Sequence, residues 1–136
     1  MQIRECTVDD VPLLAKMNQF FIEDEEGELN ISIPHLEDRM KSFITSEYKA
    51  YFFLIDEKIT GYALCSTSRS PVYLRQFFID RDERRKGYGR QAFNLLLSHL
   101  NVQADDVDVY AWNDSAIRFW RSLGFETRRY AMLYRK

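Results

Sequence analysis

The stretch that most constrains the fold lies in the middle of the chain, where a strand-like run leads through a basic, glycine-containing turn into a helix-like run. Residues 72–79 are mostly apolar and aromatic, which is typical of a buried strand, and residues 84–90 have the sequence RRKGYGR. From Gln91 to Leu100 apolar residues recur at the i, i+3, i+4 spacing of a helix. A strand, a turn and a helix in this order predict an α/β domain with an anion site at the start of the helix.

The composition of this turn suits a phosphate group. The first turn of a helix has free backbone N–H groups and carries the positive end of the helix dipole. We expect Gly87 and Gly89 to remove side chains that would keep an anion away from those groups. Positive charge comes from Arg84, Arg85, Lys86 and Arg90. The turn therefore predicts binding of a phosphorylated small molecule.

The other patterns predict one domain, residues 1–136, in the order βααβββαβαβ. Helical spacing and capping residues predict helices over residues 7–21, 32–44, 91–100 and 113–123. Alternating or continuous apolar runs predict strands over residues 3–6, 50–55, 59–66, 72–80, 106–111 and 125–135, the last as one long strand or a bent pair. The acidic run Glu23–Glu28 is expected to be a loop or a frayed helix end. No internal repeat or linker interrupts this mixed α/β pattern.

Composition excludes several classes of protein. Hydrophobic residues make up 46% of the 136 residues, enough for a real core and too many for a disordered chain. The net charge of −2 argues against a general nucleic-acid binder, which usually has a basic excess. Cys6 and Cys65 lack CxxC spacing and are expected to be buried thiols in a reducing compartment. Without a signal-like or membrane-spanning apolar run, we expect a cytoplasmic protein.

Two motifs carry a family resemblance. Arg84-x-x-Gly87-x-Gly89 matches the Q/R-x-x-G-x-G/A signature for the pyrophosphate of acetyl-coenzyme A, and residues 113–125 match the second signature, N-x-x-A-x-x-F/L-Y-x-x-x-G-F, except that Trp120 replaces the tyrosine. With this spacing and element order, the chain resembles the GCN5-related N-acetyltransferase (GNAT) family. The resemblance implies a mostly antiparallel mixed sheet with one splayed parallel strand pair, flanked by helices, and acetyl-coenzyme A as cosubstrate.

The resemblance also implies residues for coenzyme A. The pantetheine arm would insert between residues 72–80 and 106–112, pairing with backbone groups of Phe77, Phe78 and Ile79, as in strand addition by a ligand. A backbone N–H near Phe78 or Ile79 would meet the oxyanion. Asn113 would contact the pantetheine arm. The pyrophosphate would lie on the turn formed by Arg84, Arg85, Lys86, Gly87, Tyr88, Gly89 and Arg90.

The acid and base of the implied acyl transfer are the weakest part of the match. Asp108 is the first candidate base, on the second splayed strand; the alternative is that it is only the solvent side of an alternating strand. The glutamate that other members carry on the preceding strand is replaced by Tyr73. Trp120 stands where the family often has a tyrosine acid; an indole N–H donates a hydrogen bond but no proton, so Trp120 contacts the sulfur or only packs.

Several alternatives stay open. Glu23–Glu28 could attract a cationic amine acceptor or be a solvated loop. Loss of the tyrosine and glutamate would also fit a coenzyme A-binding sensor or partner module without turnover. A nucleic-acid-binding role for Arg81 and the basic turn is disfavoured by the acidity of the chain. No metal is expected, since no cluster has ligand spacing, and an exposed final strand, residues 125–135, would favour a homodimer.

Overall fold

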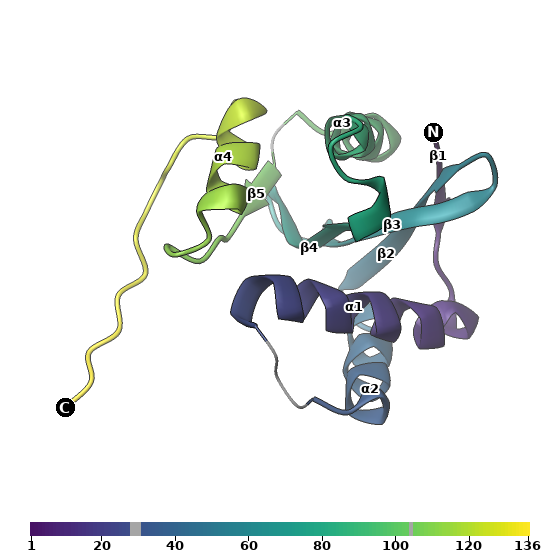
Figure 1. The fold of residues 1–136 in the computed structure, drawn as a ribbon, viewed down its shortest axis with the longest axis horizontal. Helices are drawn as coiled ribbons and strands as arrows, with labels where there is room; N and C mark the ends of the chain where they lie inside the picture. Colours follow the sequence, from purple (N-terminus) through teal and green to yellow (C-terminus); the bar gives the residue numbers. More distant parts are fainter. Residues whose placement is uncertain (28–30, 104) are drawn as a thin grey trace.

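The structure is a computed structural model that describes residues 1–27, 31–103 and 105–136. Five strands form one sheet in the order β1-β2-β3-β4-β5 (Figure 1). The strands are β1 (Gln2–Glu5), β2 (Tyr48–Ile55), β3 (Lys58–Ser66), β4 (Val72–Ile79) and β5 (Asp105–Val107). The α-helices are α1 (Val11–Glu26), α2 (Ile33–Ile44), α3 (Tyr88–Leu100) and α4 (Asp114–Ser122), with short 3-10 turns η1 (Val8–Asp10) and η2 (Arg81–Glu83). This architecture confirms the predicted fold class.

The sheet changes character at its last strand. β1 to β4 pair antiparallel, whereas β4 and β5 pair parallel, with Val72 opposite Asp105 and Leu74 opposite Val107. The register of this parallel pair stops there, although β4 continues to Ile79. Beyond Leu74, β4 therefore has a strand neighbour on its β3 side only, among the described residues, which is the splay that the resemblance implied.

Helices cover both faces of the sheet, α1 and α2 on one and α3 and α4 on the other (Figure 1). On the first face Leu14 and Met40 pack against Phe52 and other side chains of the sheet. On the second face Leu96 and Trp120 pack against the sheet. Both cores depend on alternation along the strands, since successive side chains point to opposite faces. The fully buried Phe52 and Phe53 lie in different cores for this reason.

The helix boundaries follow local sequence signals. The hydroxyl of Ser32 accepts a hydrogen bond from the backbone N–H of His35, which begins α2. Gly124, with a φ of 103°, follows α4 and adopts a backbone conformation that L side chains rarely take. The expected loop or frayed end at residues 23–28 is instead helical to Glu26, and Glu28 lies outside the described residues.

The strand prediction for residues 125–135 was wrong, and the prediction for residues 106–111 was too long. β5 ends at Val107, and residues 125–136 form an extended tail without strand pairing that leaves α4 away from the sheet (Figure 1). The apolar pattern predicted a strand, but a strand forms only where a neighbour satisfies its backbone hydrogen bonds. Among the described residues, the β4–β5 pairing covers Val72–Leu74 and Asp105–Val107 and does not continue along the chain.

Candidate active site

The open edge of β4 is the first component of the site. Residues 76–79 pair with β3 on one side, while the chain after β5 diverges on the other. The N–H of Asp80 donates to the carbonyl of Thr60 on β3. This bond fixes which backbone groups of β4 point toward β3. Since backbone groups alternate in direction along a strand, Phe77 and Ile79 direct their N–H and C=O groups to the open edge, and Phe78 directs its own toward β3. The ladder thus favours Phe77 and Ile79 over Phe78 for backbone contacts with a ligand.

The glycine turn lies at the end of this open edge and leads into α3. Gly87 has a φ of 77° and is the residue before the helix, while Arg85 has a φ of 64°. Nothing lies within 4 Å of the position that a Gly87 Cβ would occupy, so this glycine is required by its backbone conformation. The N–H groups of the first helical residues, from Tyr88, have no intrahelical acceptor and suit an anion.

Gly89 makes a close packing contact that the sequence analysis did not predict. A Cβ at this position would lie 2.9 Å from Cε1 and 3.1 Å from Cζ of Phe119. The ring of Phe119 also stacks on Phe77, with centroids 6.0 Å apart. Gly89 therefore lets α3 pack closely against the aromatic ring of α4, and this contact ties the glycine turn to the second motif.

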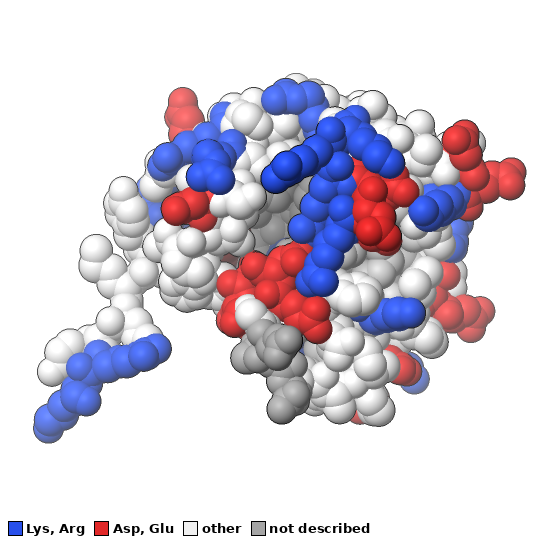
Figure 2. Space-filling model, viewed as in Figure 1, with Lys and Arg blue, Asp and Glu red and all other residues white. Residues whose placement is uncertain are grey.

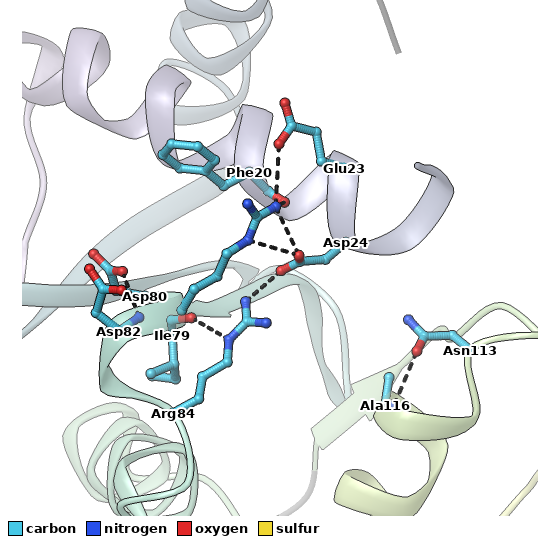
Figure 3. Close-up of polar contacts among 10 residues, drawn as sticks. Phe20, Glu23, Asp24, Ile79, Asp80, Asp82, Arg84, Asn113 and Ala116 are labelled. Atoms are coloured by element: carbon cyan, nitrogen blue, oxygen red, sulfur yellow. Dashed lines mark hydrogen bonds and ion pairs between the residues drawn. The ribbon is translucent and has the colours of Figure 1, made fainter. Parts of the chain in front are cut away.

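The basic side chains of the turn have partners within the protein. The Nε of Arg84 donates to the carbonyl oxygen of Ile79 at 2.9 Å, and its guanidinium also pairs with Asp24 (Figure 3). Lys86 pairs with Glu83 at 3.0 Å, and Arg90 donates to the carbonyl of Ser122 at 3.0 Å. Arg85, like the other three basic residues, is exposed to solvent. The basic turn is thus fixed to β4, to α4 and to the end of α1.

Ion pairs connect this turn to α1. Arg81 contacts Glu23 at 3.3 Å and Asp24 at 3.0 Å, so that Asp24 bridges Arg81 and Arg84 (Figure 3). Figure 2 shows a basic band and an acidic patch meeting beside a hollow in the same face of the molecule. The sequence pattern did not predict these contacts, because about sixty positions separate the paired residues.

The space between the open edge of β4 and the segment after β5 is called the opening below. The candidate base lies where the two strands begin to diverge. The hydroxyl of Tyr73 on β4 donates to Oδ2 of Asp108 at 3.0 Å, joining the two diverging strands. Burial, and then the neighbouring Asp108 carboxylate, raise the pKa of Tyr73 to about 12, so this hydroxyl keeps its proton. From the sequence alone, Asp108 is the candidate base and Tyr73 only the residue that replaces the glutamate of other members. The structure brings them together because β4 and β5 run parallel, with Tyr73 opposite Asp106 and Asp108 two residues further on.

Trp120 lies inside an aromatic cluster. It is 8% exposed, and its ring is 4.9 to 5.9 Å from the rings of Phe119, Phe125, Phe77 and Phe93. Edge-to-face contacts of this kind stabilise a core beyond simple burial. Trp120 thus packs on the side chain of Phe77, a residue of β4 whose backbone faces the open edge.

Asn113 and the segment that precedes it make contacts that hold the local structure. Oδ1 of Asn113 accepts a hydrogen bond from the N–H of Ala116 at 3.2 Å and caps α4 (Figure 3). The hydroxyl of Tyr110 donates to Glu26 at 3.0 Å, and the indole N–H of Trp112 donates to the backbone carbonyl of Glu25 at 3.3 Å. These two bonds hold the segment after β5 against the end of α1. The acidic end of α1 therefore borders the opening.

Within the described ranges, no group of three or more histidine, cysteine or acidic side chains is placed to hold a metal ion. Nor does any helix described there combine the length and apolar character needed to cross a membrane.

Solved structures share this fold over the whole chain. A possible acetyltransferase from Clostridium difficile 630 matches with a TM-score of 0.80 and 20% identity, covering 99% of this chain and 96% of that one. A tetramutant protein from Bacillus halodurans matches with a TM-score of 0.79 and 26% identity, covering 100% of both chains. The aminoglycoside N-acetyltransferase AAC(6')-Iy in complex with coenzyme A matches with a TM-score of 0.74 and 15% identity, covering 99% of this chain and 93% of that one.

No curated protein sequence matches the chain at a significant level. The sequence model of the acetyltransferase (GNAT) family, however, matches residues 14–125. That range contains the diverging β4–β5 pair, the glycine turn and both motifs, and the solved structures with the same fold include acetyltransferases. The chain therefore belongs to the acetyltransferase (GNAT) family.

Proposed function

We propose that this protein transfers the acetyl group of acetyl-coenzyme A to a primary amine. The observation that carries the proposal is the open edge of β4 at Phe77 and Ile79, which ends at the glycine turn and the first turn of α3. Such an edge suits the amide groups of a pantetheine arm, and the helix start suits a pyrophosphate. The turn adds Arg85, Lys86 and Arg90 at the surface.

The proposed chemistry needs one proton acceptor. A primary ammonium has a pKa of about 10.4 and must lose a proton before its nitrogen attacks the thioester carbonyl. Asp108 accepts that proton directly or through water, held in place by the Tyr73 hydroxyl. The C–N bond forms, the C–S bond breaks, and the second proton that the nitrogen loses passes to the departing thiolate or to water. Because a thiol has a pKa of about 8.5, thiolate departure costs roughly 2 kcal/mol at pH 7, and Trp120 need not donate a proton.

The acceptor is proposed to be cationic. Burial, together with the adjacent acidic groups, raises the pKa of Glu25 to about 7, so a bound ammonium would favour its ionised form. Glu26, held by Tyr110, lies at the same border of the opening. A polyamine, an aminoglycoside, a protein N-terminus or a lysine fits this description, and the neighbour AAC(6')-Iy is an aminoglycoside N-acetyltransferase.

The first experiment is calorimetric titration of the protein with acetyl-coenzyme A, followed by thiol release with a panel of primary amines. Binding together with turnover would support the proposal and rank the acceptors. Binding without turnover by any amine would favour the alternative, a coenzyme A-binding sensor or partner module, which the Trp120 substitution motivates. Absence of binding would contradict both functions.

The Asp108→Asn variant tests the base. We expect kcat/KM to fall about 100-fold at neutral pH, the lower end of the usual contribution of a positioned base, with acetyl-coenzyme A affinity unchanged. Asp114→Asn, an exposed carboxylate at the start of α4, is the matched control. An unchanged kcat/KM in Asp108→Asn over the whole pH range would remove Asp108 from the mechanism.

We further propose a cytoplasmic homodimer. The location is supported by Cys6 and Cys65, which are buried free thiols and suit a reducing compartment. The dimer is supported by the unpaired edge of β5 and by the exposed tail that follows α4.

A further inference from the structure

Two arginines stack on one aromatic ring of α2, on the sheet face that α1 and α2 cover. The guanidinium carbon of Arg75 on β4 lies 4.7 Å from the ring centroid of Phe43, and that of Arg39 on α2 lies 5.6 Å from the same centroid. Arg75 is also 5.6 Å from the ring centroid of Tyr48 and donates from Nη1 to its hydroxyl at 3.2 Å. Two positive charges held on one ring repel each other, so the arrangement is most favourable when an anion lies beside both.

An irregularity in β4 directs Arg75 to this face. The register of β3 against β4 shifts there, because Leu74 and Gln76 face consecutive residues of β3 and Arg75 faces none. A bulge of this kind changes the direction of a side chain and is common beside active sites. Tyr73, two positions earlier, packs on the same face and holds Asp108, the proposed base. The side chain of Arg75 therefore lies on the same side of the sheet as the proposed chemistry.

The contacts of these arginines leave positive charge for a ligand. In the described part of the chain, neither guanidinium forms a salt bridge. The Nε of Arg39 is buried and has no hydrogen-bonding partner among the described residues. Hydrogen bonds from Ser68 and Ser66 chiefly hold the pKa of Glu47 below its usual range, and the charge of Arg75 contributes least. A buried donor without a partner costs free energy, which a bound anion would remove.

Both arginines act on residues that border the opening. Burial and then the neighbouring carboxylate raise the pKa of Tyr73, and the charge of Arg75 opposes this shift. The hydrogen bond to Glu26 raises the pKa of Tyr110 most, and the charge of Arg39 opposes that shift. The opening thus lies within electrostatic range of both the acidic end of α1 and the two arginines.

We propose that Arg39 and Arg75 bind a carboxylate of the amine acceptor, so that the acceptor is an amino acid and not a polyamine or an aminoglycoside. This inference rests on the proposed acetyl transfer and names its acceptor class. The planar guanidinium groups suit the two oxygens of a carboxylate. The ammonium of the same molecule is attracted to the acidic end of α1, and its nitrogen lies beside Asp108. A purely cationic acceptor has no group for the arginines and is repelled by them.

The test uses the proteinogenic amino acids as acceptors, each beside its own carboxamide, which lacks the negative charge. Thiol release from acetyl-coenzyme A gives kcat/KM for the wild type, Arg39→Gln and Arg75→Gln. The amide also changes the basicity of a neighbouring amine, so the decisive quantity is the change in the acid-to-amide ratio between wild type and variant. Lys41→Gln, which removes an exposed positive charge on the same helix α2, is the matched control. Circular dichroism reports folding, and the exposed Arg75 carries the test if Arg39→Gln does not fold.

We expect the acid-to-amide ratio of kcat/KM to fall at least about tenfold in each arginine variant, mainly through KM, and to stay within about twofold in Lys41→Gln. An unchanged ratio in both arginine variants would overturn the carboxylate site and leave the proposed acetyl transfer in place. Turnover of polyamines or aminoglycosides without turnover of any amino acid would do the same. Absence of thiol release with every amine would contradict the proposed acetyl transfer itself, and this inference with it.

Discussion

The two strands that border the proposed site differ sharply in how they are held. β4 is hydrogen-bonded to β3 over most of its length and buries side chains in both cores, whereas β5 pairs over Asp105–Val107 only. The proposed coenzyme side, from β4 through the glycine turn to α3, is held by the pairing of β4 with β3 and by the side-chain contacts of the turn. The proposed acceptor side, from β5 to the tail, leaves apolar side chains exposed. Both regions have an alternating apolar sequence. The pairing of each strand with its neighbours therefore explains why β4 is held more firmly than β5.

The largest expected effect is on the rigid side, at Gly61. A Cβ there would lie 2.3 Å from the carbonyl oxygen of Phe78, a backbone atom that cannot move without disturbing β4. We expect Gly61→Ala to lower the free energy of unfolding by about 3 kcal/mol in urea denaturation. Gly27→Ala is a comparison that measures backbone strain without a steric clash, because its Cβ would meet nothing within 4 Å and its positive φ opposes the change. A cost below about 1 kcal/mol for Gly61→Ala would contradict a rigid β3–β4 pair.

The second prediction concerns the packing of Gly89 on Phe119. Gly89→Ala should destabilise the protein by about 1–2 kcal/mol because the new Cβ meets the ring. Adding Phe119→Leu should restore most of that loss. Titration of both variants with acetyl-coenzyme A separates two roles of Gly89. If the double variant regains affinity along with stability, Gly89 only packs. If its affinity stays low, Gly89 also leaves room for the anion.

A pH-dependent prediction tests the β5 side at Asp105. Burial raises the pKa of this carboxyl to about 7, and its oxygens have no hydrogen-bonding side-chain or backbone partner at good geometry. Between pH 4 and pH 7 the folded state therefore holds more protons than the unfolded state, and stability falls as pH rises through this window. Asp105→Asn should be more stable than the wild type by about 1–2 kcal/mol at pH 8, after allowing for residual solvent contact, and equal to it below pH 4.

Thermal and urea unfolding at pH 3.5 and pH 8 measure this difference. Asp9→Asn, an exposed carboxylate in η1, is the control and should show no such change with pH. If Asp105→Asn and the wild type have the same pH dependence, then Asp105 is solvated and β5 is less buried than the structure indicates.

The smallest expected effect is at the contact that joins the glycine turn to α1. Asp24→Asn removes the bridge between Arg81 and Arg84 and should cost less than about 1 kcal/mol of stability, because the pairs are partly exposed. Freed from Asp24, Arg84 is available to a phosphate, so we expect acetyl-coenzyme A to bind a few-fold more tightly at low salt in calorimetry. Asp38→Asn, an exposed residue of α2, serves as the control. Weaker binding would indicate that Asp24 holds Arg84 in its binding position.

Much of the coenzyme side could be predicted from the sequence because its signals are local. The apolar run of β4, the glycines of the turn and the helical spacing of α3 each depend on residues close together in the chain. The contacts between distant parts of the chain could not be predicted in this way. The Tyr73–Asp108 hydrogen bond and the Arg84–Asp24 ion pair join residues 35 and 60 positions apart, and no local pattern marks them.

The sequence by itself determined the mixed α/β class, the order of the elements up to α4 and the place of the glycine turn, because propensity, capping and periodicity act over a few residues. Only the tertiary structure decided that Gly89 packs against Phe119, that β5 ends at Val107 and that residues 125–136 leave the sheet. A strand needs a neighbour to satisfy its backbone, and which neighbour is available depends on the arrangement of the whole chain.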